Sequence, residues 1–224
     1  MIEQCARLCC AGAMPMRTTA TSPTTPTAER LLTVAESLFL QDGYDAVSVR
    51  AINTAAGMSP AAVHYHFGSK EGLVARLLED RLAPLWRERL EDIAGNGQPP
   101  VAELVDAILI PLAELAADPV GRLRLHLLAR TVLAGKPMHW NSPWFKLAPW
   151  VDRLRASRPD LTGEEAAHRW RLAFELVLRE FGDPLGERAG SRPVPSVPLP
   201  TLAAFVTAGL SAPPGARPQE EGHR

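Results

Sequence analysis

The 224-residue chain lacks an excess of either charge, because 24 Lys and Arg stand against 25 Asp and Glu and leave a formal net charge of −1. Bulk attraction to nucleic acid is therefore excluded, and any DNA contact must come from a few well-placed side chains. The chain also lacks an apolar run of the ~18–20 residues that a membrane helix needs. Its first thirteen residues are interrupted by Arg7 and do not resemble a signal peptide. We expect a cytoplasmic protein with no membrane partner.

Cysteine is nearly absent: Cys5, Cys9 and Cys10 are the three in the chain, and all precede the first expected helix. No disulfide is available to the rest of the chain, which fits a reducing compartment. The cluster has no histidine nearby, so we expect no metal site. An alternative is that translation starts at Met14 or Met16 and the cysteine segment is not part of the mature protein.

Catalytic signatures are missing too, since the chain has no G-x-S-x-G, H-x-x-x-H or glycine-rich phosphate loop. His64 and His66 are two residues apart on an expected helix, so they point about 200° apart and cannot share a zinc ion. We therefore expect no enzyme and no cofactor. A helical enzyme remains an alternative hypothesis.

What the chain does contain is apolar residues at helical spacing, without an alternating strand pattern of useful length. This pattern predicts an all-α fold with a flexible arm at 1–26, a three-helix head at 27–82, a helical body at 83–211 and a disordered tail at 212–224. Body helices are expected at about 100–117, 119–135, 143–157, 163–182 and 199–210, with a loop at 183–198. We expect Pro84 to kink or break the helix that starts after Ser69, near Arg81.

The head shows the parts of a helix-turn-helix. Thr27, Ser48, Ser59 and Ser69 are candidate N-caps, and Gly43 and Gly57 are candidate helix ends. On the second short helix, Val63 and Phe67 would face the core, while Ala61, Ala62 and Tyr65 would face outward into a major groove. The predicted DNA-binding residues are Ser48, Arg50, Ser59, Pro60, Ala61, Ala62, His64, Tyr65, His66 and Lys70.

The stretch Glu29–Leu82, and within it "LFLQDGYDAVSVR", "AAG" and "YHFGSKEGL", resembles the DNA-binding head of the tetracycline-repressor (TetR) family. The resemblance implies an all-helical repressor whose body dimerises and binds a small molecule that moves the heads off a pseudo-palindromic double-stranded operator. It implies base contacts from Arg50 and Tyr65, a groove lined by Ser59, Ala61 and Ala62, and backbone contacts from His64, His66 and Lys70. Departures from the family pattern are His64 for a usual tyrosine or asparagine, Asn53 for alanine and Ala51 for an acid.

The body offers candidates for an effector pocket and a homodimer face. All five tryptophans lie outside the head, and a mostly apolar pocket is predicted from Trp86, His126, Arg130, Trp140, Trp144, Phe145, Trp170 and Phe174. A four-helix dimer seam is predicted from Ala173, Leu176, Val177, Glu180, Leu202, Ala203, Val206 and Leu210. Ordinary packing within one subunit is the competing interpretation of both sets.

One feature opposes DNA binding: between Thr27 and Leu82 five basic residues stand against seven acidic ones. Specific binding must then depend on a few contacts and on dimer avidity. The acidic head also keeps open a second alternative, a helical interaction module that does not bind DNA.

Overall fold

The structure is a computed structural model that describes residues 25–95, 98–135, 138–182 and 195–214. These residues form helices and one 3₁₀ turn and contain no strand, which confirms the all-α expectation. The helices are α1 (Pro26–Asp42), α2 (Val49–Ala55), α3 (Ala62–Phe67), α4 (Lys70–Gly95), α5 (Val101–Ala116), α6 (Pro119–Leu133), η1 (Pro143–Phe145), α7 (Ala148–Ser157), α8 (Gly163–Gly182) and α9 (Leu199–Ser211). The three cysteines, and most of the expected arm, 183–198 loop and tail, lie outside the described residues.

Helix ends in the head follow local capping chemistry, with one correction. The N-cap of α1 is Thr25, whose hydroxyl accepts from the Ala28 N–H at 3.3 Å, so the prediction of Thr27 is wrong. Pro26 explains the shift, because its fixed φ favours the first helical position. Gly43 ends α1 with φ 83° and a bond from its N–H to the Phe39 carbonyl, as predicted. Ser48 and Ser69 cap α2 and α4 by accepting from Ala51 N and Gly72 N at 3.1 and 3.0 Å.

Helix α4 runs unbroken through Pro84, so the expected break near Arg81 does not occur. A proline inside a helix costs about 3 kcal/mol because it removes one hydrogen bond and crowds the preceding turn. Leu82 and Trp86 on either side of it are 0% and 6% exposed, and their burial offsets that cost. The expected boundary between 82 and 83 therefore lies inside one helix that the head and the body share.

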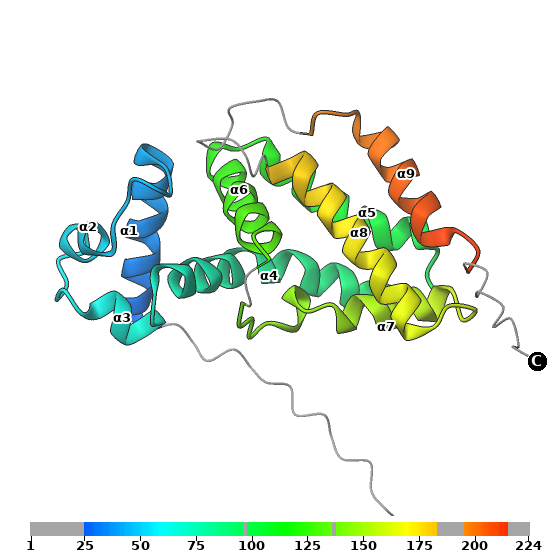
Figure 1. Ribbon diagram of the computed structural model, residues 1–224, viewed down its shortest axis with the longest axis horizontal. Helices are drawn as coiled ribbons and strands as arrows, with labels where there is room; N and C mark the ends of the chain where they lie inside the picture. The colour runs from blue at the N-terminus through cyan, green and yellow to red at the C-terminus, as the bar shows by residue number, and fades with distance from the viewer. Residues whose placement is uncertain (1–24, 96–97, 136–137, 183–194, 215–224) are drawn as a thin grey trace, which may run out of the picture.

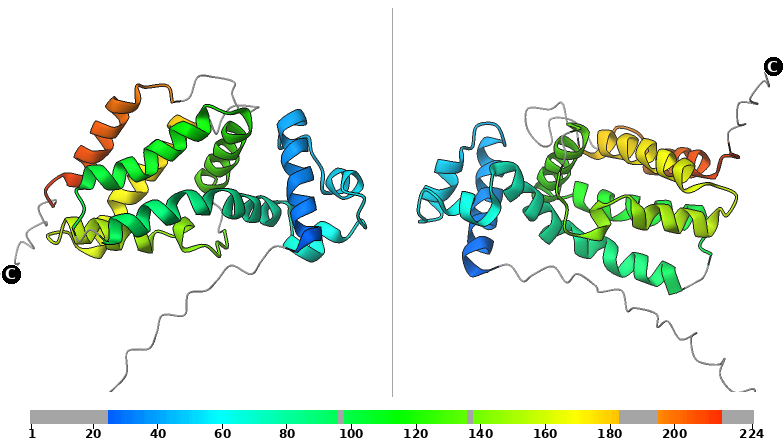
Figure 2. Two further views of the ribbon diagram at one scale, coloured as in Figure 1. Left: turned by 180° about the vertical axis from the view of Figure 1, so that it is seen from behind. Right: turned by 60° about the horizontal axis from the view of Figure 1, so that its bottom comes forward.

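The body is a set of helices packed around α8, and the head lies at one end of the molecule (Figure 1). Helix α6 is the body helix that approaches the head, and α7 and the end of α9 lie at the far end in both further views (Figure 2). A close contact joins α6 to the last turn of α8, where a Cβ on Gly182 would lie 2.1 Å from the Ala129 Cβ. Only glycine allows this approach. None of the described helices is long and apolar enough to cross a membrane.

The predicted helix 143–157 is two elements, η1 and α7, separated by Lys146 in an extended conformation. Pro149 in the first turn of α7 fits the start of a new helix there, because proline has no backbone N–H to donate to the Phe145 carbonyl four residues earlier. The Trp150 indole N–H donates to the Trp144 carbonyl at 3.1 Å and closes the corner between the two elements.

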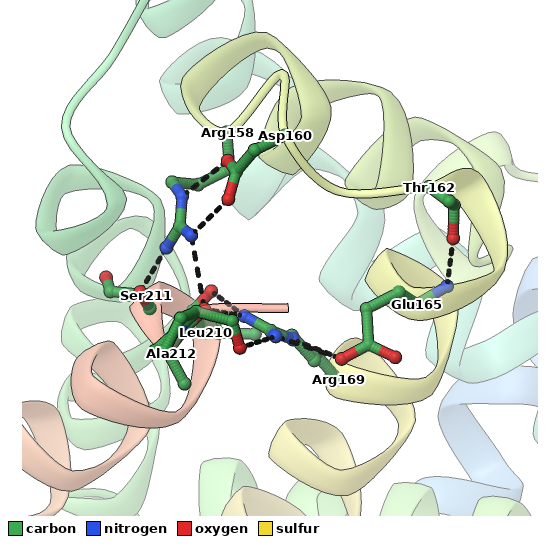
Figure 3. Close-up of polar contacts among 9 residues, drawn as sticks. Arg158, Asp160, Thr162, Glu165, Arg169, Leu210, Ser211 and Ala212 are labelled. Atoms are coloured by element: carbon green, nitrogen blue, oxygen red, sulfur yellow. Dashed lines mark hydrogen bonds and ion pairs between the residues drawn. The ribbon is translucent and has the colours of Figure 1, made fainter. Parts of the chain in front are cut away.

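Two arginines hold the C-terminal end of α9 (Figure 3). Arg169 of α8 is 9% exposed, and its guanidinium donates to the carbonyl oxygens of Leu210, Ala212 and Pro213. Arg158 adds bonds to the Ser211 and Ala212 carbonyls. The last carbonyls of a helix have no intrahelical partner, so these donors satisfy them and also oppose the negative end of the helix dipole.

Candidate nucleic-acid interface

The turn between α2 and α3 is held by a buried amide. Asn53 is 1% exposed; its Nδ2 donates to the Pro60 carbonyl at 2.7 Å, and its Oδ1 accepts from the Val63 N–H at 3.2 Å. Each bond contributes about 1 kcal/mol, and leaving either backbone group unpaired would cost more. Sequence reasoning recorded Asn53 as a departure from a family pattern and missed this role. The available signal was its position two residues before the end of α2, next to the inward-facing Ile52.

The prediction of Ser59 as an N-cap is wrong. The predicted hydroxyl cap is absent, and α3 starts after Ala61 without a side-chain cap. The N–H of Ala62, which a Ser59 hydroxyl would have accepted, donates instead to the Ser59 backbone carbonyl, and the side-chain oxygen of Asn53 accepts from the next donor, Val63 N. Helix α3 consequently begins two residues later than expected.

The outer face of α3 is narrower than the sequence indicated. Ala62 is 8% exposed and packs in the head's core beside Val63, so it does not belong to the outward surface. Ser59, Pro60, Ala61, His64 and Tyr65 are exposed, and Arg50 is exposed on α2. Tyr65 is 85% exposed, the most exposed large hydrophobic side chain among the described residues. His66 is partly buried and meets the Tyr65 ring edge-on at 5.0 Å, which supports the tyrosine from one side.

Lys70 is fixed against the head rather than extended into solvent. Its ammonium donates to the Tyr44 carbonyl at 2.6 Å and lies 3.9 Å from the centroid of the Tyr44 ring. Burial lowers the pKa of Lys70, and nearby Asp45 and Glu71 oppose that shift. Burial likewise raises the pKa of Tyr44, and the carboxylate of Glu71 adds to this. An ammonium has three donors, so this bond places the charge without using all of them.

The acidity of the head is largely compensated by ion pairs. Four of its seven carboxylates pair with arginines: Glu29 with Arg81, Glu36 with Arg124 at 2.7 Å, Asp45 with Arg130 at 2.7 Å, and Asp80 with Arg76 at 2.9 Å. Two of these arginines, Arg124 and Arg130, belong to the body helix α6. The head's sequence alone therefore overstates the negative charge that it presents in the folded protein.

The predicted pocket residues do not form one site. Trp86, Trp140 and Phe145 make one aromatic cluster, in which Phe145 lies 5.9 Å from Trp86 and 4.7 Å from Trp140 between ring centroids. In another, Trp170 stacks on Phe174 and Trp150 meets both rings at an angle. Arg130 and His126 join neither cluster: Arg130 pairs with Asp45, and His126 Nδ1 lies 3.1 Å from the Gly182 carbonyl oxygen, which accepts. Trp144 supplies its carbonyl to Trp150. The structure does not bring Arg130, His126 and Trp144 together with the ring clusters as one lining, and their role in an effector pocket stays a prediction.

A narrow cleft adjoins the second cluster between α5, α8 and α9. Its lining is entirely apolar and consists of Val105, Ile108, Leu109, Trp170, Ala173, Phe174, Val177 and Val206. In this conformation the cleft has no space for a water molecule. Within the described ranges, no three His, Cys, Asp or Glu side chains are grouped as a metal site would require.

The predicted dimer stripe lies mostly inside the subunit. Ala173, Val177, Leu202, Val206 and Leu210 are at most 8% exposed, so they pack α8 and α9 onto the body and cannot meet a partner. The competing interpretation, core packing, holds for these five residues. Leu176, Glu180 and Ala203 are partly buried. The exposed large apolar residues of these two helices are instead Leu172 at 70% and Phe205 at 68%.

Two short helices joined by a turn that Asn53 holds, with a supporting first helix, have the arrangement of a helix-turn-helix head on an α-helical body. Residues 31–77 match the family model described as bacterial regulatory proteins, tetR family. The transcriptional regulator UidR of Escherichia coli K12 is 32% identical over 71 residues, which are 30% of this chain and 36% of UidR. The chain thus aligns with about a third of the length of these curated relatives.

Solved structures extend the likeness to the body. NalD of Pseudomonas aeruginosa, the secondary repressor of the MexAB-OprM multidrug efflux pump, is 25% identical with a TM-score of 0.55, over 82% of this chain and 94% of NalD. The triclosan complex of SmeT, a repressor from Stenotrophomonas maltophilia, shares the fold at 21% identity and a TM-score of 0.52, over 87% of this chain and 100% of SmeT. The head thus matches the TetR family model, and the fold of head and body together is similar to that of these two repressors.

Proposed function

We propose that this protein is a homodimeric transcriptional regulator that binds a pseudo-palindromic operator, acts as a cytoplasmic repressor, and is released from DNA by a small apolar molecule. The observation that carries the proposal is the α3 surface, where Tyr65 projects from a helix whose start is fixed by Asn53. A low-profile helix of this kind fits a major groove, and a tyrosine offers a ring for thymine methyl groups and a hydroxyl for a base edge or phosphate.

Alanine at Tyr65 or Arg50 tests DNA binding. Both side chains are exposed, so either change should leave the melting temperature within about 2 °C of the wild type. A base contact contributes about 1–3 kcal/mol and is made twice in a dimer, so we expect operator affinity to fall roughly a hundredfold. This affinity is measured by fluorescence anisotropy, with a duplex that the wild-type protein selects from a random-sequence pool.

The matched control for Arg50→Ala is Arg155→Ala. Arg155 is exposed on α7, far from the head, so this variant loses an arginine charge as Arg50→Ala does but should bind the duplex normally. If wild-type protein selects no duplex at low salt, the alternative of a helical interaction module is supported instead. Equal affinities for wild type, Tyr65→Ala and Arg50→Ala would contradict this interface.

The proposed dimer face is the outer surface of α8 and α9. Leu172 and Phe205 give it apolar area, and α9 carries no charged residue over its whole length. Arg171 and Glu175, exposed one turn apart on α8, suit a second copy, because a two-fold axis places the arginine of one subunit near the glutamate of the other. Monomeric proteins seldom expose such a face without a partner.

The apolar cleft beneath α9 is the effector site that we propose, and an uncharged ligand would enter by displacing α5 or α9. The absence of polar lining excludes recognition of a charged group there. Its position below the proposed dimer face supports coupling, because moving α9 would change how the two bodies, and hence the two heads, are related.

Triclosan and a series of alkylbenzenes are suitable probes of this cleft. We expect binding to change tryptophan fluorescence and to lower affinity for the selected duplex about tenfold, a typical allosteric coupling. Trp170→Phe should remove most of the fluorescence change, whereas Trp140→Phe, in the other aromatic cluster, should retain it. The reverse pattern, or no response to any probe, would exclude this cleft as the effector site.

A further inference from the structure

Beyond the α4 helix that head and body share, the two parts are joined by side chains of α6. Arg130, near the C-terminal end of α6, pairs with Asp45 at 2.7 Å, and its guanidinium carbon lies 5.2 Å from the centroid of the Tyr44 ring. Tyr44 and Asp45 lie in the connection between α1 and α2, 85 residues away in sequence from Arg130. A residue of the body therefore contacts the loop that leads into the helix-turn-helix.

The head side of this contact is rigid. The Tyr44 ring packs on Phe39 with centroids 5.4 Å apart and is covered by the Lys70 ammonium at 3.9 Å, while the Tyr44 carbonyl accepts from that ammonium. Lys70 and Arg130 both approach the ring, and Asp45 supplies the opposing charge between the two cations. A displacement of Arg130 would therefore affect the first turn of α4, through Lys70, as well as the α1–α2 connection.

The body side is equally well fixed. Ala129, next to Arg130, touches the site where Gly182 lets α8 approach, and His126 one turn earlier contacts the Gly182 carbonyl oxygen. Near the middle of α6, Arg124 pairs with Glu36 of α1 at 2.7 Å, with side chains only 22% and 14% exposed. Helix α6 therefore contacts both α8 and the head, and these contacts hold the backbone of Arg130 in place.

We infer that the contact of Arg130 with Tyr44 and Asp45 sets the angle between head and body, and we call this contact the latch. Arg130 is then a positioning residue, because that angle determines which operator half-site spacing the dimer accepts. This inference rests on the proposed function. A dimer reads two half-sites at a separation given by its geometry, and each inserted base pair turns one half-site by about 34–36° and moves it by about 3.4 Å. Heads that can swing on α4 tolerate such a change, whereas latched heads do not.

The test measures the affinity of the full-length dimer for several DNA duplexes. The first is the duplex that the wild-type protein selects from a random pool. The others are the same duplex with one central base pair inserted or removed, and a duplex that contains one half-site. The ion pair and the cation–π contact together contribute about 1 kcal/mol in each head. We expect Arg130→Gln to weaken binding to the selected duplex about tenfold, and to leave the altered spacings and the single half-site within threefold of the wild type. Discrimination between spacings should fall accordingly.

Rescue and salt dependence separate positioning from direct contact with DNA. Exchanging the charges, with Arg130→Asp and Asp45→Arg in one protein, should restore discrimination that either change alone removes. Arg130→Gln should leave the slope of log affinity against log salt unchanged, because no phosphate contact is lost; a shallower slope by about 0.9 per head would identify Arg130 as a phosphate ligand and overturn the inference. Arg155→Gln is the charge-matched control and should retain wild-type discrimination.

A readout without DNA keeps the inference separate from the proposed function. Amide deuterium exchange of residues 43–48 should rise severalfold in Arg130→Gln and stay unchanged in Arg155→Gln, because only the former releases the loop. If the wild-type protein selects no duplex, the proposed function fails, and the exchange result alone then decides whether Arg130 holds the α1–α2 connection; unchanged exchange in Arg130→Gln would refute that contact. If the wild type binds and Arg130→Gln lowers affinity equally for every spacing and for the half-site, the latch is refuted while the proposed function stands.

Discussion

Phe205→Asp is expected to split the dimer and to lower operator affinity at least a hundredfold without unfolding the subunit. The side chain is 68% exposed, so the isolated subunit loses little packing when it is replaced. In the proposed dimer both copies of the change would bury a carboxylate against the apolar outer face of α9, at a cost of several kcal/mol. Loss of the second head removes the avidity that two linked sites provide, which ranges from 10²- to 10⁴-fold.

Light scattering after size exclusion gives the first measurement, a change from twice 24.3 kDa to 24.3 kDa. Anisotropy on the selected duplex gives the second, and circular dichroism should show unchanged helix content. Ala156→Asp on exposed α7 adds the same charge away from the face and should remain dimeric. A Phe205→Asp protein that keeps the dimer mass would exclude the outer face of α9 from the interface, and Leu172→Asp would then show whether α8 alone forms it.

The sequence predictions were correct where the deciding interaction is local in sequence and wrong where it comes from a distant residue. Ser48, Ser69 and Gly43 were assigned correctly because each makes its capping bond within four residues of itself. Ser59 was assigned wrongly because its own backbone carbonyl takes the Ala62 N–H, in a turn that Asn53 also holds through the Val63 N–H ten residues away. Pro84 was overestimated since its local cost was visible, but the burial of Leu82 and Trp86, which offsets that cost, was not.

Helical periodicity locates a buried stripe but does not say what covers it. On α8 and α9 the stripe at Val177, Val206 and Leu210 is covered by the subunit's own helices. Leu172 and Phe205 lie off that stripe, so a pattern search for apolar spacing passes over them. The DNA-binding head was easier to locate, because its helix lengths and turns are short and its Tyr65 surface follows from local geometry alone.

Charge needed the tertiary structure as well. The head's excess of carboxylates suggested weak DNA binding, and its sequence contains no hint that Arg124 and Arg130, more than 80 residues away, neutralise Glu36 and Asp45. The same long-range pairs are what join the head to α6. The excess of carboxylates, which in the sequence argued against DNA binding, is thus explained by ion pairs that join the head to α6.

Arg169→Met is the substitution that we expect to destabilise the body most. Arg169 is 9% exposed, and its guanidinium donates to the Glu165 carboxylate at 2.9 Å and to three carbonyl oxygens at the end of α9 (Figure 3). Methionine fills the volume but leaves these carbonyls without donors in a largely buried site. Losing several charge-assisted hydrogen bonds of this kind costs about 3 kcal/mol. For a chain of this length that corresponds to a fall in Tm of roughly 6–12 °C.

Calorimetry or thermal circular dichroism measures that fall, and two variants assign its cause. Arg169→Lys keeps the charge but replaces a fork of five donors with a single ammonium, so most of the loss should remain. Arg155→Met makes the same replacement on exposed α7 and should melt within about 2 °C of the wild type. Because α9 carries Phe205, release of its end should also weaken the dimer. A melting temperature in Arg169→Met equal to that of Arg155→Met would show that the α9 terminus is held by its apolar face alone, through Leu202, Val206 and Leu210.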